Sequence, residues 1–198
     1  MSGVPQDPIE LFIELYAQAR RLDPLVIREP HAMSLATVDS AGRPSVRLLL
    51  LKGVDVRGFT FYTNLGSRKA RDLLVNPHAA LCFYWFPLDL QVRVEGRATQ
   101  VPDDEADEYF ATRPRGSQIG AWASRQSEVI ERVGDLEERV ARYEREFEDK
   151  DVSRPPFWSG FRIEPSRIEF WRNRTNRLHD RVLYTRDGDG WRMDTLYP

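Results

Sequence analysis

The sequence contains one cysteine, three histidines and no long apolar run. Cys82 alone can form no intrachain disulfide, and its apolar surroundings predict a buried thiol in a reducing, cytoplasmic setting. His31, His78 and His179 are too dispersed to form a metal site with that cysteine. No segment approaches the ~20 apolar residues of a membrane span. The N-terminus lacks the pattern of a signal peptide, so we expect neither a span nor a leader.

An excess of charge of one sign is also missing. The formal net charge is −2 over 198 residues, which is typical of a globular protein and argues against a nucleic-acid partner. The length predicts a single domain over residues 1–198. Glycine-rich nucleotide fingerprints and a nucleophile elbow are absent, so an organic cofactor is expected to supply the chemistry if the protein is an enzyme.

Apolar periodicity and turn residues predict an α+β fold around an antiparallel sheet or barrel, because short turns join most of the strands. Leucine at 48–51 indicates a strand that is buried on both faces. The turn composition of 187–190 predicts a hairpin. Helices are predicted over 7–22, 67–76 and 103–112, and strands over 33–38, 45–52, 59–63, 79–86, 90–100, 160–164, 167–171, 181–185 and 191–196. A further helix is predicted from the apolar stripe Ile130, Val133, Leu136, Val140, Tyr143 and Phe147.

Basic residues at the start of a predicted helix indicate one anion site. Ser67 can cap this helix, and Arg68 and Lys69 place positive charge where the helix dipole disfavours it. A bound anion would remove that conflict, whereas a capped helix with two solvated bases is the alternative.

Three other groups of polar residues could bind a ligand. Tyr109 and Arg113 share a helix face at the spacing i, i+4, and Ser117 can cap the next helix, so they form a plausible second phosphate site. If residues 177–181 are extended, Arg177, His179 and Arg181 lie on one strand face, with Leu178 pointing into packing. Arg47 and Lys52 bracket a strand at an odd spacing that points them to opposite faces, and Gln91 could meet the polar edge of a heterocycle. Surface bases, a salt-bridge ladder and a surface glutamine are the respective alternatives.

Taken together, these segments resemble the pyridoxine 5'-phosphate oxidase family. The resemblance is carried, in order and spacing, by the runs 47–52, 61–69, 113–122, 124–127 and 169–181. It implies a split β-barrel homodimer with FMN at the subunit interface. It also implies oxidation of pyridoxine or pyridoxamine 5'-phosphate to pyridoxal 5'-phosphate, with O2 as electron acceptor and H2O2 as product.

The resemblance also implies roles for individual residues. The substrate phosphate would be bound by Lys52, Tyr109, Arg113 and Ser117, and the pyridine ring would be held by Arg177 and His179, which are the expected catalytic residues. The implied FMN contacts are Arg47, Leu48, Leu49, Leu50, Leu51, Lys52, Tyr62, Thr63, Arg68, Lys69, Gln91, Gln126, Ser127, Trp171 and Arg181.

Two other functions remain open at this point. One is a different FMN split-barrel oxidoreductase, such as a relative from a phenazine pathway, which would keep the flavin contacts and differ around 177–181. The other is a carrier of flavin or pyridoxal phosphate that performs no catalysis. Arg172 and Gly116 depart from residues common in the family, at positions with no implied contact.

Overall fold

One antiparallel sheet organises the chain in the computed structural model, which describes residues 6–198. The elements in chain order are α1 (Pro8–Arg20), β1 (Ala32–Val38), β2 (Pro44–Leu50), β3 (Gly53–Asp55), β4 (Gly58–Asn64), α2 (Arg68–Val75), β5 (His78–Trp85), η1 (Phe86–Leu88), β6 (Leu90–Gln100), α3 (Asp103–Ala111), α4 (Arg115–Ala123), α5 (Asp135–Glu146), β7 (Trp158–Arg172), η2 (Thr175–Arg177), β8 (Asp180–Asp187) and β9 (Gly190–Thr195).

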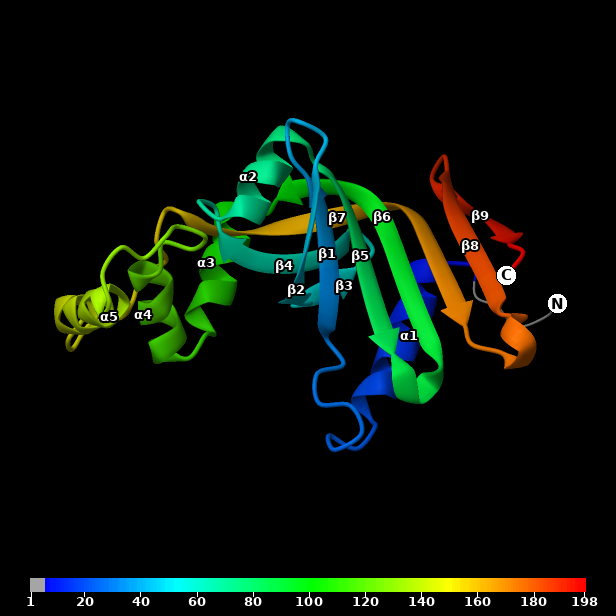
Figure 1. Cartoon of the computed structure of the whole chain (residues 1–198), viewed down its shortest axis with the longest axis horizontal. Helices are drawn as coiled ribbons and strands as arrows, with labels where there is room; N and C mark the ends of the chain where they lie inside the picture. The colour runs from blue at the N-terminus through cyan, green and yellow to red at the C-terminus, as the bar shows by residue number, and fades with distance from the viewer. Residues whose placement is uncertain (1–5) are drawn as a thin grey trace.

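The strand β7 connects the two parts of this sheet. The strand order is β2-β1-β5-β6-β7-β4-β3, and β8 and β9 extend the sheet from β7. The first half of β7 pairs with β4 and its second half pairs with β8, so the sheet curls into a half-barrel (Figure 1). Every strand pair is antiparallel, which confirms the predicted α+β class.

Aromatic side chains of α1 and the sheet fill the core. The N-cap Asp7 accepts a hydrogen bond from the N–H of Ile9, and the helix then places Phe12 inside the half-barrel. The Phe12 ring packs 4.8 Å from Phe59 and 4.9 Å from Phe83, measured between ring centroids. Complete burial of three such rings makes this contact a main source of stability.

A second apolar cluster joins the helices α3, α4 and α5 to the start of β7, at the left of Figure 1. Phe110 of α3 and Ile119 of α4 are buried in it, and Trp158 at the start of β7 joins them. Val140, Tyr143 and Phe147, in and just after α5, pack against its outside. The cluster therefore fixes the helical layer relative to β4 and β7.

The structure corrects several predicted elements. The predicted strands 160–164 and 167–171 are one strand, β7, with a register shift opposite Glu95 and Gly96. A Cβ on Gly96 would lie 2.1 Å from the carbonyl oxygen of Glu164, so this close approach requires glycine. The predicted stripe is too long at its start, because α5 begins at Asp135 and leaves Ile130 and Val133 exposed. The short strand β3 was not predicted.

The strand β2 also differs from its prediction. It lies at an edge of the sheet, and only its inward face is covered within the chain. The outward side chains of Val46 and Leu48 are 68% and 74% exposed, so the prediction of two buried faces is wrong for the isolated chain. An apolar edge of this kind is a surface to which another chain can bind.

No helix among residues 6–198 has the length and apolar character needed to cross a membrane.

Candidate functional site

A cavity of about 570 Å³ lies between β4 and the helices α3 and α4. The end of β2 and the loop after α4 complete its wall, so segments far apart in the sequence meet there. The predicted site residues that line it are Leu49, Leu50, Lys52, Tyr62, Thr63, Tyr109, Arg113, Ser117 and Gln126.

Stacked aromatic rings form one wall of the cavity. The Tyr62 ring lies 3.9 Å from that of Tyr109 and 5.4 Å from that of Trp158, and the three planes are nearly parallel. Burial, aided by the charge of Glu105, raises the pKa of Tyr62 to about 12, so its hydroxyl stays protonated at neutral pH. The wall therefore offers aromatic surface and the neutral hydroxyl of Tyr62 to a ligand.

Arg113 supplies a buried cation beside this wall. Its guanidinium lies 4.7 Å from the Trp158 ring centroid, and burial lowers its pKa. Its Nη1 is buried without a hydrogen-bond partner among residues 6–198, which is costly unless a ligand binds there. α3 ends before Arg113, so the i, i+4 helix argument is wrong, although Tyr109 and Arg113 still line one cavity.

Ser117 reaches the cavity from within a helix. The prediction that it caps α4 is wrong, because α4 begins at Arg115 and the Ser117 N–H already donates to the carbonyl of Pro114 at 2.8 Å. Its hydroxyl is accordingly not needed to satisfy the helix end.

Lys69 is a buried cation at the edge of the same site. Its side chain is only 7% exposed, and its Nζ donates to Thr63 Oγ1, Ser67 Oγ and Gln126 Oε1 at 3.1, 3.1 and 2.9 Å. These acceptors are neutral, and within residues 6–198 no carboxylate pairs with Lys69. Burial, and then the charge of Arg47, lowers the pKa of Lys69 to about 8. A buried lysine in this setting favours an anionic ligand.

We expect the lowered pKa of Lys69 to be visible in stability measurements. Its value of about 8 lies below the ordinary 10.5 of an unfolded chain. The cost of burying the charge is therefore fully present below about pH 8 and is lost as the pH rises to 10.5. The unfolding free energy of the ligand-free chain should rise over this window, relative to Lys69→Met, by up to about 3 kcal/mol. Denaturant titrations of both proteins at several pH values measure it, and a constant difference would contradict it.

The N-terminus of α2 adds backbone donors near Lys69. This helix has no acidic residue in its first turn and no side-chain cap, and Ser67 instead accepts from Lys69. Ser67 therefore occupies the predicted N-cap position, but its side chain makes no capping hydrogen bond. The backbone N–H of Arg68 donates to Ser127 Oγ at 3.2 Å, and Ser127 has a left-handed φ of 76°. Hydroxyl groups thus occupy the position that an anion would take at a helix N-terminus.

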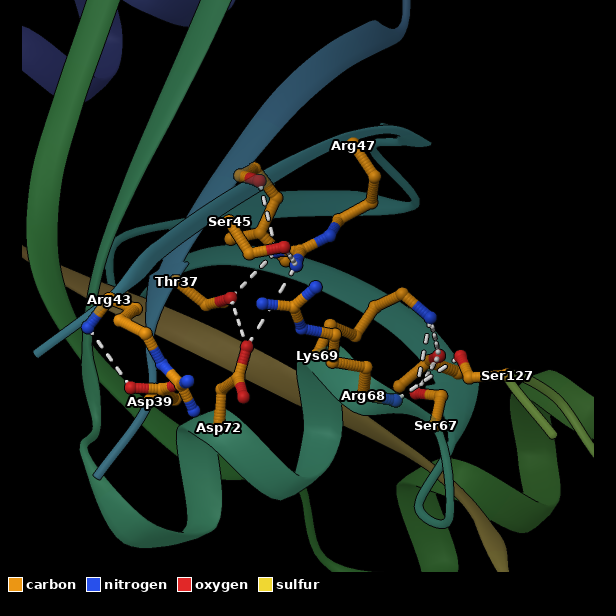
Figure 2. A network of polar contacts seen from close by, with 12 residues as sticks. Thr37, Asp39, Arg43, Ser45, Arg47, Ser67, Arg68, Lys69, Asp72 and Ser127 are labelled. Atoms are coloured by element: carbon orange, nitrogen blue, oxygen red, sulfur yellow. Dashed lines mark hydrogen bonds and ion pairs between the residues drawn. The ribbon is translucent and has the colours of Figure 1, made fainter. Parts of the chain in front are cut away.

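Arg47 approaches this group from β2, as Figure 2 shows. It faces the interior, since it pairs across the strands with the buried Leu35. Leu48 beside it points outward and is exposed, whereas Leu51 is buried. Lys52 follows the end of β2, so the predicted alternation from Arg47 to Lys52 along an unbroken strand is wrong.

A second group of predicted site residues lies elsewhere. Gln91 of β6, Trp171 of β7 and Arg181 of β8 are aligned side by side across three strands, and the His179 ring lies 4.5 Å from the Trp171 ring. None of them lines the cavity. β8 and the turn that precedes it lie at the right of Figure 1, whereas α3 and α4 lie at its left. Within one chain, the predicted residues therefore lie in two separate groups. We call each a half-site: one is at the cavity and beside Lys69, and the other is around Trp171.

The segment that carries Arg177 and His179 is a turn rather than a strand. Arg177 ends η2 with a left-handed φ of 61°, β8 begins only at Asp180, and Leu178 is 66% exposed. The predicted extended segment with Leu178 in packing is therefore wrong. The Arg174 N–H donates to His179 Nδ1 at 3.2 Å, so a neutral His179 carries its proton on Nε2 and can donate there.

Two residues that shape these half-sites had no predicted role. Trp158 forms part of the aromatic wall. Glu169 is 4% exposed and binds both Arg93 and Arg181, the latter at 2.8 Å. Burial alone would raise the pKa of Glu169, but the hydrogen bonds from Arg181 and Arg93 outweigh it and lower the pKa. The sequence signal for the ion pair between Arg93 and Glu169 was the position of Arg93, two residues after Gln91 on the same strand face.

Comparison with known proteins places this arrangement in a family. A family model described as "Pyridoxamine 5'-phosphate oxidase" matches residues 24–172. The chain belongs to the pyridoxamine 5'-phosphate oxidase family. A second model, described as the pyridoxine 5'-phosphate oxidase C-terminal dimerisation region, matches residues 158–198, which include Trp171, Arg177, His179 and Arg181. The members of this family are oxidoreductases.

Curated relatives agree with membership in the pyridoxamine 5'-phosphate oxidase family. The chain is 56% identical over 196 residues to the pyridoxine/pyridoxamine 5'-phosphate oxidase of Rubrobacter xylanophilus, covering 99% of this chain and 89% of the relative. It is 53% identical over 195 residues to the protein of the same name from Myxococcus xanthus, with coverage of 98% and 93%.

Solved structures confirm the fold. PhzG from Burkholderia lata, determined with tetrahydrophenazine-1-carboxylic acid, matches with a TM-score of 0.91 and 33% identity over 98% of this chain and 94% of that one. A pyridoxamine 5'-phosphate oxidase-related, FMN binding protein from Nostoc punctiforme matches with a TM-score of 0.74 and 19% identity over the full length of both chains. The predicted split-barrel architecture is thus confirmed.

Proposed function

We propose that the protein is an FMN-dependent oxidase that converts pyridoxine or pyridoxamine 5'-phosphate to pyridoxal 5'-phosphate, with O2 as acceptor and H2O2 as product. The observation that carries the proposal is a pair of buried cations, Arg113 in the wall of the cavity and Lys69 behind its lining residues Thr63 and Gln126. Lys69 has no anionic partner within residues 6–198, and Arg113 has a buried Nη1 without any partner there. Two separate cations suit two phosphates, one on the cofactor and one on the substrate.

The residues around Lys69 fit the phosphate of FMN. They provide a buried ammonium, the N-terminus of α2 and the hydroxyls of Thr63 and Ser127. Bound FMN would supply the redox chemistry, that is, hydride acceptance from the substrate and reoxidation by O2. The other proposed FMN contacts in this half-site are Arg47, Leu48, Leu49, Leu50, Leu51, Lys52, Tyr62, Arg68 and Gln126.

The protein's own groups then bind and orient the substrate. Arg113, with Lys52, Tyr109 and Ser117, would hold the substrate phosphate, and this remote binding energy helps to align the reacting carbon. Arg177 and His179 would hold the pyridine ring, with His179 donating from Nε2. A hydride-ready pose requires the reacting atoms at ~3–3.5 Å.

A homodimer would bring the two half-sites together. The half-site with Gln91, Trp171 and Arg181 lies apart from the cavity in one chain, and residues 158–198 match a dimerisation region. A twofold axis would place this half-site of each chain against the cavity of its partner, so two equivalent active sites would form. The exposed apolar edge at Val46 and Leu48 is available for such contact. On sequence grounds, we further propose a cytoplasmic location.

An absorbance spectrum of the purified protein, followed by addition of pyridoxine 5'-phosphate under air, tests the activity. We expect a bound-flavin spectrum and release of H2O2. Flavin binding without peroxide release would instead indicate a carrier. The likeness to PhzG favours a phenazine precursor as a second candidate substrate, and turnover of tetrahydrophenazine-1-carboxylic acid in preference to pyridoxine 5'-phosphate would support it.

Complementation between two inactive variants tests the shared site. Arg113→Ala damages the cavity and Arg177→Ala damages the other half-site, so each homodimer should be nearly inactive. Their heterodimer would contain one doubly damaged site and one intact site, because each site takes its halves from different chains. We expect about half of wild-type activity per heterodimer. Co-expression with two affinity tags isolates the heterodimer for steady-state assays.

The matched control is a chain that carries both substitutions, paired with a wild-type chain. Each site of that heterodimer would contain one damaged half, so it should remain nearly inactive. If each chain formed a complete site by itself, the result would be reversed: the control heterodimer would keep about half of wild-type activity, and the first heterodimer would be nearly inactive.

A further inference from the structure

The carboxylate of Asp72 lies near Arg47, on the same helix as Arg68 and Lys69. α2 packs against β1, and this contact brings Asp72 to Thr37. Both side chains are buried, with Asp72 6% exposed and Thr37 fully covered. Thr37 Oγ1 donates to Asp72 Oδ2 at 2.7 Å. Because a threonine hydroxyl has one proton, Thr37 can only accept in its other contacts.

Arg47 is the group that donates to Thr37. Its Nη1 donates to Thr37 Oγ1 at 2.8 Å and to the carbonyl of Leu35 at 3.1 Å, and its Nη2 donates to Ser45 Oγ at 2.7 Å. Nη2 also lies 3.9 Å from Asp72 Oδ2. Three of the five N–H groups of the guanidinium are thus used within residues 6–198, and Nε–H and one N–H of Nη2 remain for a ligand.

The charges around Arg47 explain why it needs support. Burial lowers the pKa of Arg47, the charge of Asp72 raises it, and the charge of Arg68 lowers it again. Lys69 also repels Arg47, because each charge disfavours the other. The cations of this half-site repel one another, and the carboxylate of Asp72 offsets this repulsion at Arg47 (Figure 2).

We propose that Asp72 is a positioning residue which, through Thr37, fixes the guanidinium of Arg47 for the phosphate of the flavin. The inference rests on the proposed function, since it takes the anion beside Lys69 to be the phosphate of FMN. Asp72 acts on the flavin only through Arg47. Its hydrogen bond orients Thr37, Thr37 orients Arg47, and a hydrogen-bond chain of this kind in a buried setting transmits the orientation.

The test compares FMN with riboflavin, which lacks the phosphate. Each flavin is titrated into the flavin-free full-length protein, and quenching of flavin fluorescence reports binding. Asp72→Ala should weaken FMN binding about tenfold and leave riboflavin binding unchanged. Asp72→Asn keeps an oxygen acceptor for Thr37, so its FMN affinity should stay within about threefold of wild type.

Two further variants separate positioning from a general effect on folding. In an Arg47→Ala background, Asp72→Ala should have no additional effect on FMN affinity, because the group that it positions is gone. Asp39→Ala is the matched control, since Asp39 pairs with Arg43 at 2.8 Å in the same hairpin without contact to Arg47, and it should leave FMN affinity unchanged (Figure 2). If Asp72→Ala fails to fold, Thr37→Val interrupts the same chain and should give the same selective loss.

The outcomes distinguish this inference from the proposed function. An equal loss for both flavins, or a loss that persists in the Arg47→Ala background, would show a structural role for Asp72 and overturn the inference. Unchanged FMN affinity in Asp72→Ala, with normal binding by the wild type, would overturn it while leaving the proposed function intact. A wild-type protein that binds FMN no better than riboflavin would overturn both.

Discussion

Alanine at Arg177 or His179 is expected to lower kcat/KM for pyridoxine 5'-phosphate about 100-fold while FMN remains bound. A guanidinium against an aromatic ring contributes ~0.5–2 kcal/mol, and the Nε2–H of His179 can bind a polar substituent of that ring. Loss of either contact loosens the reactive pose, where small misplacements can cost on the order of 100-fold in rate. Steady-state kinetics on flavin-loaded variants measure this loss.

The geometry of the turn strengthens the expectation for Arg177. A left-handed φ is unfavourable for arginine, and such backbone conformations persist where the surrounding structure holds them. Arg186→Ala is a suitable control. Arg186 lies on β8, and its guanidinium stacks on the Trp191 ring at 4.5 Å from the ring centroid. Near-normal kcat/KM in both Arg177→Ala and His179→Ala would remove the ring-holding role.

Replacement of both Arg68 and Lys69 by alanine should weaken FMN binding at least 100-fold. A hydrogen bond to a charged group contributes about 1.5–3 kcal/mol, so loss of two such contacts to phosphate has a large effect. The fold should lose little stability, since Arg68 is exposed and removal of Lys69 also removes the cost of a buried charge. Flavin titration gives the affinity, and thermal unfolding of the flavin-free protein gives the stability.

Arg71→Ala provides the matched control for this pair. Arg71 is exposed on the same helix, one residue beyond Ala70, and it should affect FMN affinity by less than about twofold if only the phosphate contacts matter. A comparable loss in Arg71→Ala would assign the effect to the overall charge of α2. Unchanged affinity in the double variant would show that neither Arg68 nor Lys69 binds the phosphate.

Local patterns were sufficient to predict most of the fold. Strict alternation defines β6, which runs over Leu90–Gln100 as predicted, and Asp7 followed by proline marks the start of α1. The prediction for β2 was wrong because an apolar run indicates burial without saying which chain covers it. The prediction for α5 was wrong because Ile130 and Val133 continue the apolar spacing outside the helix.

The site could be predicted less completely, for a physical reason. Positive charge at a helix start indicated Lys69, but its burial depends on packing that joins Thr63 and Gln126 from distant segments. The turn at Arg177 breaks the period-two pattern that would have aligned it with Arg181. The alignment of Gln91, Trp171 and Arg181 needs the register of three strands, which no single segment specifies.

The length of β7 has a consequence for the spacing of the two half-sites. Trp158 at its start belongs to the aromatic wall of the cavity, and Trp171 near its end belongs to the second half-site. One continuous backbone of 15 residues joins them, which at about 3.3 Å per residue spans at most about 43 Å between the two tryptophans. In the proposed dimer, the length of the strand would therefore set the distance between the two active centres. A two-residue insertion in β7 would keep the same side chains facing inward. It would nevertheless shift one half-site relative to the other by about 7 Å.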